Sequence, residues 1–417
     1  MSKPVDFDIA ICGGGMVGAT LAALLVSNPQ LKDLRIALIE AQVPLPPTDE
    51  VDVRVSALSR ASERVLSRCG AWSLIKAAHR SEYQDMVVWD AASPVPDLNH
   101  TQHALHFSAS SMAEPNLGYI ISNNCVQWAA LERCNQLGIT RLATMLSAIQ
   151  LYESHARIQL SDGRSLTARL VIGADGARSA SRERVGINAH VKPYEQTALV
   201  THVRTQQLHQ FTAWQRFLTN GPIALLPLND GRSSIVWTTT PEHAEELLKL
   251  DESQLSAAIG DACNHVLGDV TVAGPRAAFP LQLAQVDEYC RPRFVLVGDA
   301  AHSIHPLAGQ GVNLGLMDAA SLVQVLSEAR ASGASVDALG EIRLLRRYER
   351  WRKSENSVAL GMIDGINRLF SNNNVVLGTA RRIGLQAVER HSIIKRFFMS
   401  RALGVAGDAP RIVKQLS

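Results

Sequence analysis

The sequence predicts an α/β protein: a Rossmann-like nucleotide-binding domain, an inserted antiparallel sheet that forms a substrate domain, and a helical C-terminal region. Three observations support this fold class. A strand–glycine–helix–strand pattern opens the chain, four strand-like runs follow one another within residues 195–240, and a buried strand beginning at Phe294 leads into a glycine-rich loop. After Gly315 the pattern is helical nearly to the end.

The chain returns to its first domain after the inserted sheet, so we expect discontinuous domains. With 417 residues and 46% apolar residues, it is long enough for two or three domains or one large discontinuous one. The expected division assigns residues 1–75, 100–190 and 280–335 to the nucleotide-binding domain. It assigns residues 76–99 and 191–279 to the substrate domain, and 336–417 to the helical C-terminal region.

The N-terminal unit has the order of a dinucleotide fingerprint. An apolar run at residues 6–12 precedes Gly13-Gly14-Gly15-Met16-Val17-Gly18, and a second apolar strand at 35–39 ends at Glu40. Glycines at this spacing permit a tight turn and the close approach of a pyrophosphate, and the acid accepts hydrogen bonds from ribose hydroxyls. The unit predicts a nucleotide site but leaves NAD and FAD as alternatives.

A second nucleotide element follows the strand that begins at Phe294. It reads Gly298-Asp299-Ala-Ala-His-Ser-Ile-His-Pro306-Leu-Ala-Gly309-Gln-Gly311-Val312-Asn313. An acid at a strand end can hold sugar hydroxyls, and amides at a helix start can stabilise negative charge. One such element at each end of a domain predicts a long ligand held at both ends, and FAD fits that description.

Between these elements the sequence predicts further secondary structure. Asp162-Gly163 indicates a hairpin within residues 156–172, whose second strand leads to Asp175-Gly176. Strands are expected at 198–203, 213–218, 223–228 and 233–239, and a helix at 241–262.

Composition narrows the function classes. The net charge of +2 gives no indication of a nucleic-acid partner. The six cysteines show no C-x-x-C pair and no zinc-ligand spacing, so we expect reduced thiols and no metal site. We see no signal peptide and no run of 18 apolar residues. We therefore expect a cytoplasmic protein, with contact to the inner membrane surface left open.

Together, the three glycine-containing motifs resemble the single-component FAD-dependent aromatic hydroxylases of the para-hydroxybenzoate hydroxylase type. Within that superfamily, three stretches are similar to the ubiquinone-biosynthesis hydroxylases over roughly residues 5–403. These are Asp52-Val-Arg54-Val-Ser-Ala-Leu-Ser59, Leu117-Gly-Tyr-Ile-Ile-Ser-Asn123 with Gln127, and Ala300-Ala-His302-Ser-Ile-His305-Pro306 continuing to Asn313.

The resemblance implies a role for each matching residue. Gly13, Gly14, Gly15 and Gly18 would surround the pyrophosphate, and Glu40 would bind the adenosine ribose. Arg54 and Gln127 would contact the phosphate or ribityl part of the flavin, and Asp299 a ribityl hydroxyl. Gly311, Val312 and Asn313 would present backbone to the pyrimidine side of the isoalloxazine, with Pro306 near its reactive edge, and Gly309 in the same loop would also belong to the cofactor site. Asp175 would serve both flavin and reduced nicotinamide.

The resemblance also implies a reaction. Reduced nicotinamide, NADH or NADPH, would reduce the flavin, and dioxygen would form a C4a-hydroperoxide that hydroxylates a prenylated phenol. The substrate would lie between the inserted sheet and the flavin, where strands 223–228 and 235–237 form either an apolar wall or plain core. No catalytic residue or base is identified. For His302 and His305, structural hydrogen bonding is favoured over proton transfer.

Two alternative functions remain open, and so does the role of the C-terminal tail. The chain could hydroxylate a small soluble aromatic compound, or it could be a non-catalytic flavin-bearing assembly subunit. Residues 376–417 mix basic residues such as Arg396 and Arg401 with apolar ones such as Phe397 and Met399. Such a segment can contact an anionic membrane surface or a biosynthetic complex, or pack on its own domain.

Overall fold

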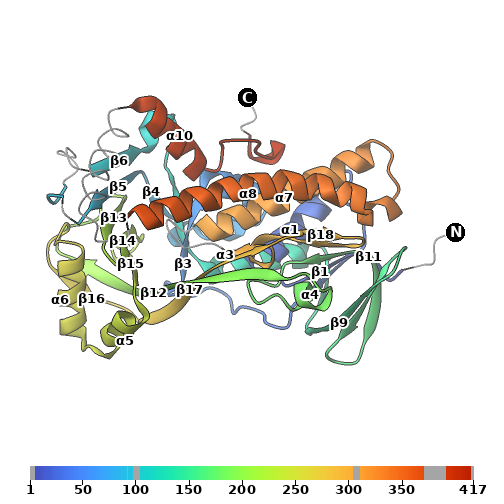
Figure 1. The fold of residues 1–417 in the computed structure, drawn as a ribbon, viewed down its shortest axis with the longest axis horizontal. Helices are drawn as coiled ribbons and strands as arrows, with labels where there is room; N and C mark the ends of the chain where they lie inside the picture. Colours follow the sequence, from blue (N-terminus) through green and yellow to red (C-terminus); the bar gives the residue numbers. More distant parts are fainter. Residues whose placement is uncertain (1–4, 92, 97–103, 304–309, 371–390, 415–417) are drawn as a thin grey trace.

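The structure is a computed structural model that describes residues 5–91, 93–96, 104–303, 310–370 and 391–414. Over this part of the chain the strands form three sheets. Figure 1 shows the first sheet at one end of the molecule, the second at the other end, and the long helices α7 (Gln310–Ala331) and α8 (Ile342–Phe370) running along one side. The mixed α/β class predicted from the sequence is confirmed.

The first sheet has a parallel centre, in which β1 pairs with β11 on one side and β2 on the other. Strands covered on both faces must be apolar throughout, which explains the continuous Ile-Ala-Ile run of β1. The hairpin predicted at Asp162-Gly163 is confirmed by the antiparallel pairing of β10 and β11. The strands are β1 (Phe7–Cys12), β2 (Ile36–Ile39), β8 (Thr140–Leu142), β9 (Leu146–Leu151), β10 (Ala156–Leu160), β11 (Ser165–Gly173), β18 (Cys290–Arg291) and β19 (Phe294–Leu296).

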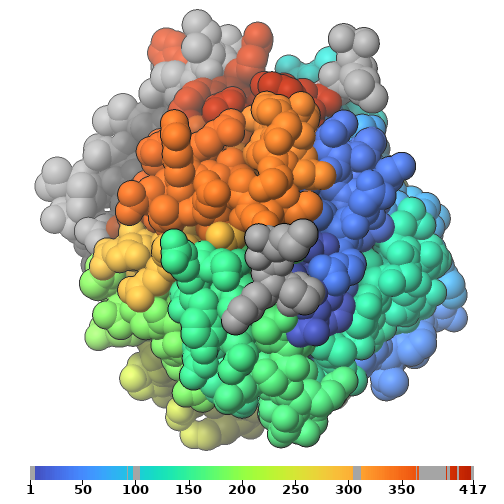
Figure 2. Space-filling view, turned by 90° about the vertical axis from the view of Figure 1, so that its right-hand side faces the viewer, coloured from blue at the N-terminus to red at the C-terminus, as the bar shows by residue number. Residues whose placement is uncertain are grey.

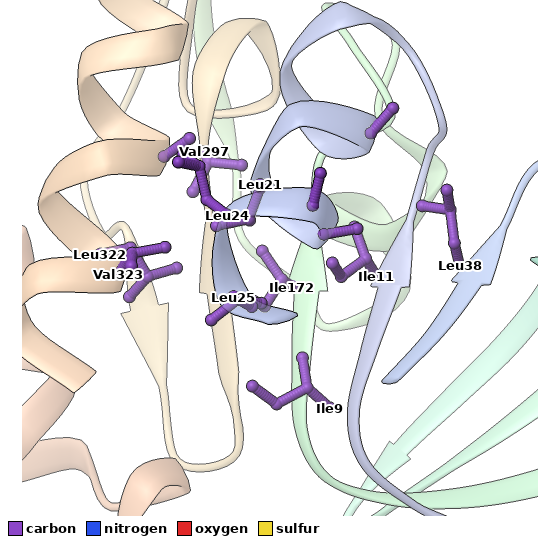
Figure 3. Close-up of a cluster of buried hydrophobic side chains, with 14 of the residues drawn as sticks. Ile9, Ile11, Leu21, Leu24, Leu25, Leu38, Ile172, Val297, Leu322 and Val323 are labelled. Atoms are coloured by element: carbon purple, nitrogen blue, oxygen red, sulfur yellow. The ribbon is translucent and has the colours of Figure 1, made fainter. Parts of the chain in front are cut away.

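Helix α1 (Met16–Ser27) lies between this sheet and α7, and this position explains its almost entirely apolar sequence. Figure 3 shows Leu21, Leu24 and Leu25 between Ile9, Ile11 and Ile172 of the sheet and Leu322 and Val323 of α7. All of them are buried. The other helices packed in this domain are α2 (Arg60–Cys69), α3 (Asn123–Gln136) and α4 (Ala180–Arg184).

The second sheet has the strand order β20-β17-β12-β15-β14-β13-β5-β6, with β16 beside β12, and confirms the predicted antiparallel insertion. Its strands are β5 (Asp85–Asp90), β6 (Ala104–Ser108), β12 (Ala189–Thr205), β13 (Thr212–Leu218), β14 (Gly221–Pro227), β15 (Ser233–Thr239), β16 (Val270–Val272), β17 (Ala277–Val286) and β20 (His302–Ser303). Strand β17 crosses the boundary predicted at residue 280, and β6 lies in this sheet; the domain division itself stays a prediction.

One face of the second sheet packs against helices α5 (Pro241–Lys249) and α6 (Glu252–Ala262). Ile223, Leu225, Ile235 and Trp237 belong to this core, so these side chains form core instead of a substrate wall. The helical segment predicted over 241–262 is confirmed, but it is divided into two helices at residues 250–251. Asp251 accepts a hydrogen bond from Gln254 N and Gln254 caps Asp251 N, so a new helix begins there.

A third, small sheet connects the two domains. It has the order β3 (Val55–Ser59), β7 (Gly118–Ser122) and β4 (Ser81–Tyr83). Ala57 and Ile120 from this sheet pack with Leu226 and Leu228 at the end of β14. The third sheet therefore joins the second sheet to the helices α2, α3 and α7 of the first domain.

The C-terminal helices pack on the rest of the protein at several places. The buried hydroxyl of Tyr348 on α8 donates to Leu296 O at 3.0 Å, directly before the Gly298-Asp299 turn. In Figure 2, α8 and α7 (orange) cover one side of the N-terminal unit (blue). Helix α10 (Ser392–Ala402) packs Met399 and Leu403 on Ala109 and Leu117, so one face of the tail docks on the protein itself. Within the described residues, no helix combines the length and apolar character needed to cross a membrane.

Candidate cofactor-binding site

Two glycines of the N-terminal fingerprint, Gly13 and Gly18, are required by close backbone approaches. Gly13 has φ +101°, and a Cβ there would stand 2.5 Å from Ala174 O at the end of β11. A Cβ on Gly18 would overlap Gly13 O. Gly15, in contrast, has an ordinary φ of −66°, and no described atom lies within 4 Å of where its Cβ would be. Gly15 therefore borders open space at the N-terminus of α1, which is where a pyrophosphate would gain from the helix dipole.

Glu40 and Gln127, both predicted to contact the cofactor, hold the glycine turn from two sides. Glu40 Oε2 accepts from Gly14 N at 2.7 Å, and Gln127 Nε2 donates to Gly14 O at 3.0 Å. A carboxylate has about four acceptor positions, so Glu40 keeps capacity for ribose hydroxyls. Their ligand contacts stay predictions, while their positioning of Gly14 is an additional role that the sequence did not reveal.

Asp175 organises the end of β11. Its carboxylate accepts from Ser179 Oγ at 2.5 Å, Ser181 N at 2.8 Å and Ser181 Oγ at 2.7 Å. Arg182, which follows on α4 and is 6% exposed, donates to Ala177 O and to Ala300 O at 3.0 Å. The Asp175-Gly176 motif is thus tied to the Asp299 turn. No local pattern distinguishes Arg182 from Arg178 or Arg184, so sequence reasoning missed it.

Asp299 lies in the turn that follows β19, beside the start of α7. As a residue Asp299 is exposed, yet the surrounding protein removes enough water from its carboxyl to raise the pKa. His302 and Arg54 oppose this rise, and Asp318 adds to it. An enclosed carboxyl that still borders solvent can accept hydrogen bonds from the hydroxyls of a ligand. Arg54 is exposed nearby, with its guanidinium 5.0 Å from the ring centre of Phe279.

A buried ionic network holds this turn in place, and no sequence pattern indicated it. Asp318 on α7 is fully buried and accepts from Gly298 N at 3.0 Å and His302 Nε2 at 2.5 Å. From α8, Arg352 Nε donates to it at 2.7 Å and Asn356 Nδ2 at 3.2 Å. Burial alone would raise the pKa of Asp318, but His302 and Arg352 hold it well below its ordinary value of 3.8. The structural role expected for His302 is thereby supported.

The start of α7 is anchored by the side chain of Asn313. Its Oδ1 accepts from Ser59 N at 2.9 Å and from Ser62 Oγ at 2.6 Å, and its Nδ2 donates to Ala57 O at 2.8 Å. Gly311 and Val312 precede it on the same helix. The side chain therefore positions the backbone that was predicted to meet the isoalloxazine. Pro306, Gly309 and His305 lie outside the described residues.

Taken together, the residues fit FAD. The open space at Gly15 suits a pyrophosphate, the exposed Asp299 suits a ribityl hydroxyl, and the carboxylate of Glu40, directly after β2, suits ribose hydroxyls. In the part of the chain that the structure describes, no group of three or more His, Cys, Asp and Glu residues is placed to hold a metal ion.

Substitution of Gly18 and substitution of Gly15 should have different effects on stability and FAD binding. Gly18→Ala should lower both thermal stability and FAD binding, because its methyl group overlaps Gly13 O. Gly15→Ala should keep the melting temperature but raise the Kd for FAD by about tenfold or more, because its methyl group occupies the approach of the pyrophosphate. Thermal melting and fluorescence titration with FAD measure both effects. Wild-type FAD affinity in Gly15→Ala would contradict this location.

Asp318→Asn should lower the free energy of unfolding by about 3–5 kcal/mol at pH 7, because Arg352 loses its buried counter-ion. Because the pKa of Asp318 is lower in the folded than in the unfolded protein, its charge stabilises the fold above the ordinary pKa of 3.8. This stabilisation is lost as the pH falls further, so the difference in unfolding free energy between wild type and variant should narrow below about pH 4. Glu328→Gln, which breaks exposed ion pairs to Arg347 and Arg411, is the control and should cost about 1 kcal/mol or less. Equal losses in urea unfolding would refute a special role for the network.

Comparisons with known proteins agree with this geometry. The family model described as FAD binding domain matches residues 6–354. The 3-demethoxyubiquinol 3-hydroxylase of Escherichia coli (strain K12) is 36% identical over 403 residues, covering 95% of this chain and 98% of the relative. The ubiquinone hydroxylase UbiL of Rhodospirillum rubrum is 36% identical over 413 residues, covering 98% and 92%. Human ubiquinone biosynthesis monooxygenase COQ6 is 33% identical over 447 residues, covering 96% and 93%.

Solved structures share the fold. The p-nitrophenol 4-monooxygenase PnpA from Pseudomonas putida DLL-E4 superposes with a TM-score of 0.73 at 17% identity, covering 95% of this chain and 98% of that one. PqsL of Pseudomonas aeruginosa, described as a probable FAD-dependent monooxygenase, gives 0.68 at 22% identity, covering 94% and 99%. The fold, the family model and the near full-length relatives agree: this chain belongs to the FAD-dependent monooxygenase family that includes the ubiquinone-biosynthesis hydroxylases.

Proposed function

We propose that the protein hydroxylates the aromatic ring of a polyprenylated phenol in ubiquinone biosynthesis, using FAD, dioxygen and NADH or NADPH. The observation that carries this proposal is the 36% identity to a 3-demethoxyubiquinol 3-hydroxylase over 95% of the chain. The alternatives, a small soluble aromatic substrate or a non-catalytic assembly role, have no comparable support.

Bound FAD supplies the electron transfer and the oxygen activation, and the protein supplies binding and orientation. We assign the pyrophosphate to the Gly15 end of α1, the adenosine ribose to Glu40, and a ribityl hydroxyl to Asp299. Asp175 and Arg182 hold the strand end beside that turn, and the Asp318 network fixes it from below. Arg54 and Gln127 are proposed to contact the phosphate or ribityl region, and the backbone from Gly311 to Asn313 the isoalloxazine.

The proposed place for the substrate is the cleft face of the second sheet, which turns away from α5 and α6. Cross-strand pairing puts five of its side chains in one row, running from β12 through β15, β14 and β13 to β5: Val200, Val236, Ala224, Gln215 and Val88. Only Gln215 is polar. An apolar row of this length suits a prenyl chain better than it suits a small soluble acid.

Cells lacking the protein should accumulate a prenylated precursor that lacks one ring hydroxyl, because no enzyme then oxidises that carbon. Mass spectrometry of extracted quinones measures this, and wild-type protein supplied on a plasmid should restore the profile. A second plasmid carrying Asp299→Ala, checked for loss of FAD, should fail to restore it. Normal ubiquinone without a precursor would favour the small-aromatic alternative, and rescue by the FAD-free variant would favour the assembly role.

We also propose that α10 contacts an anionic membrane surface, because the prenylated substrate would be dissolved in the bilayer. Met399 and Leu403 face the protein, and Arg401 pairs with Glu355 at 3.2 Å. On the outer side, Arg396 is exposed and Phe397 is 49% exposed. A cation beside an exposed aromatic ring is the composition of an interfacial helix.

The double variant Arg396→Glu/Phe397→Ser should bind anionic vesicles at least about fivefold less than wild type, since it reverses one charge and removes an apolar contact. Vesicle co-sedimentation measures this. The matched control is Arg204→Glu/Leu208→Ser, which changes an exposed cation at the end of β12 and an exposed apolar side chain in the loop that follows. Equal binding by the wild type and both variants would exclude α10 as the contact. Substitution is preferable to deletion of residues 376–417, because Met399 and Leu403 pack on the protein.

A further inference from the structure

Two buried polar side chains on neighbouring strands lack partners. His202 on β12 stands directly opposite Ser234 on β15, and both are 0% exposed. Over the described structure, neither ring nitrogen of His202 nor the hydroxyl of Ser234 has a hydrogen-bond partner. Leaving such groups unpaired costs about 1–3 kcal/mol each. A pair that only stabilised the fold would be expected to find partners in the protein.

Strand alternation places this pair on the cleft face. Leu199, Val203 and Ile235 lie in the core against α5 and α6, so His202 and Ser234, in the other register, point to the opposite side. Ser234 is also paired with Leu226 of β14. Leu226 in turn packs with Ala57 and Ile120 of the third sheet, and β3 of that sheet follows directly after Arg54. The polar pair thus lies on the side where the second sheet faces the cofactor domain.

A cavity adjoins the same apolar contact. It has a volume of about 490 Å³, within the range of small-molecule sites, and Val51, Ile120 and Leu228 belong both to its wall and to the apolar cluster around Leu226. Asp230, also on its wall, and Asp52 act electrostatically on His202. His202 is therefore within electrostatic range of the cavity.

His202 is suited to bind a neutral oxygen. Burial lowers its pKa below 6.5, and the charge of Arg232 lowers it further, against smaller opposing contributions from Asp230 and Asp52. The imidazole is then mostly neutral near pH 7, so one nitrogen donates and the other accepts. Ser234 Oγ beside it can do both. A phenolic hydroxyl, which also donates and accepts, complements this pair.

We propose that His202 and Ser234 bind an oxygen substituent on the ring of the aromatic substrate and so determine which ring the pocket accepts. This inference rests on the proposed function. Because neither group has a partner among the described residues, a ring without that oxygen would leave both unpaired, and such sites discriminate strongly against analogues that lack the group.

The test compares two probes that differ in one oxygen: 2-geranylphenol and geranylbenzene. Their Kd values are measured from the change in flavin absorbance on binding to the oxidised, FAD-loaded protein. Wild type should prefer the phenol. His202→Leu and Ser234→Ala should weaken phenol binding, by at least about tenfold for His202→Leu, and leave geranylbenzene unchanged or tighter.

Ser233→Ala is the matched control, because Ser233 is the adjacent serine, equally buried and unpartnered among the described residues, but on the core side opposite Val203. It should bind both probes like wild type. His202→Leu should also keep or raise the melting temperature of the substrate-free protein, because it removes an unpaired polar group. If His202→Leu fails to fold, Ser234→Ala against Ser233→Ala decides.

Three outcomes would overturn the inference. Equal weakening of both probes in the variants would indicate a general packing effect, and an unchanged preference for the phenol would indicate that buried water, not substrate, pairs with these groups. If FAD-loaded wild type binds neither probe, the proposed function fails and this inference with it. The first two outcomes leave the proposed function intact.

Discussion

The carboxylate of Asp318 is the interaction on which the site most depends. It is fully buried, and it connects the Gly298 turn, His302 and two residues of α8 at a single point. A buried charge is tolerated only when it is fully paired. The pairing therefore forces α7, α8 and the turn into one relative position, and Asp299 follows Gly298 directly. Tyr348, which binds Leu296 O one turn earlier on α8, strengthens the same connection.

The rest of the site is built outward from that fixed turn. Arg182 links it to the Asp175 strand end, and Asn313 links the start of α7 to β3. The glycine turn and Glu40 form the other end of the same sheet edge. The second sheet then contributes an apolar cleft face that meets β3 and β7 through Leu226. In the function proposed above, this arrangement would hold FAD at two ends and leave the second sheet to bind the substrate.

The sequence predicted the parts whose chemistry is local. Gly13, Gly15 and Gly18 lie within one short turn, where Gly18 approaches Gly13 O, and the hairpin depends on the single turn at Asp162-Gly163. It did not predict the Asp318–Arg352 pair, whose members lie 34 residues apart on different helices and look like ordinary helical charges. The division of 241–262 into two helices was missed although Asp251 and Gln254 carry a recognisable capping pattern. His202 and Ser234 come together only through strand register, which no local pattern fixes.

The most direct measurement is a crystal structure of the protein with FAD and 2-geranylphenol bound. We expect the pyrophosphate at the Gly15 end of α1 and a ribityl hydroxyl within hydrogen-bonding distance of Asp299. We also expect the ring of the phenol between the flavin and the cleft face. FAD bound away from Asp299, or a phenol bound on the α5–α6 side of the second sheet, would contradict the proposed arrangement.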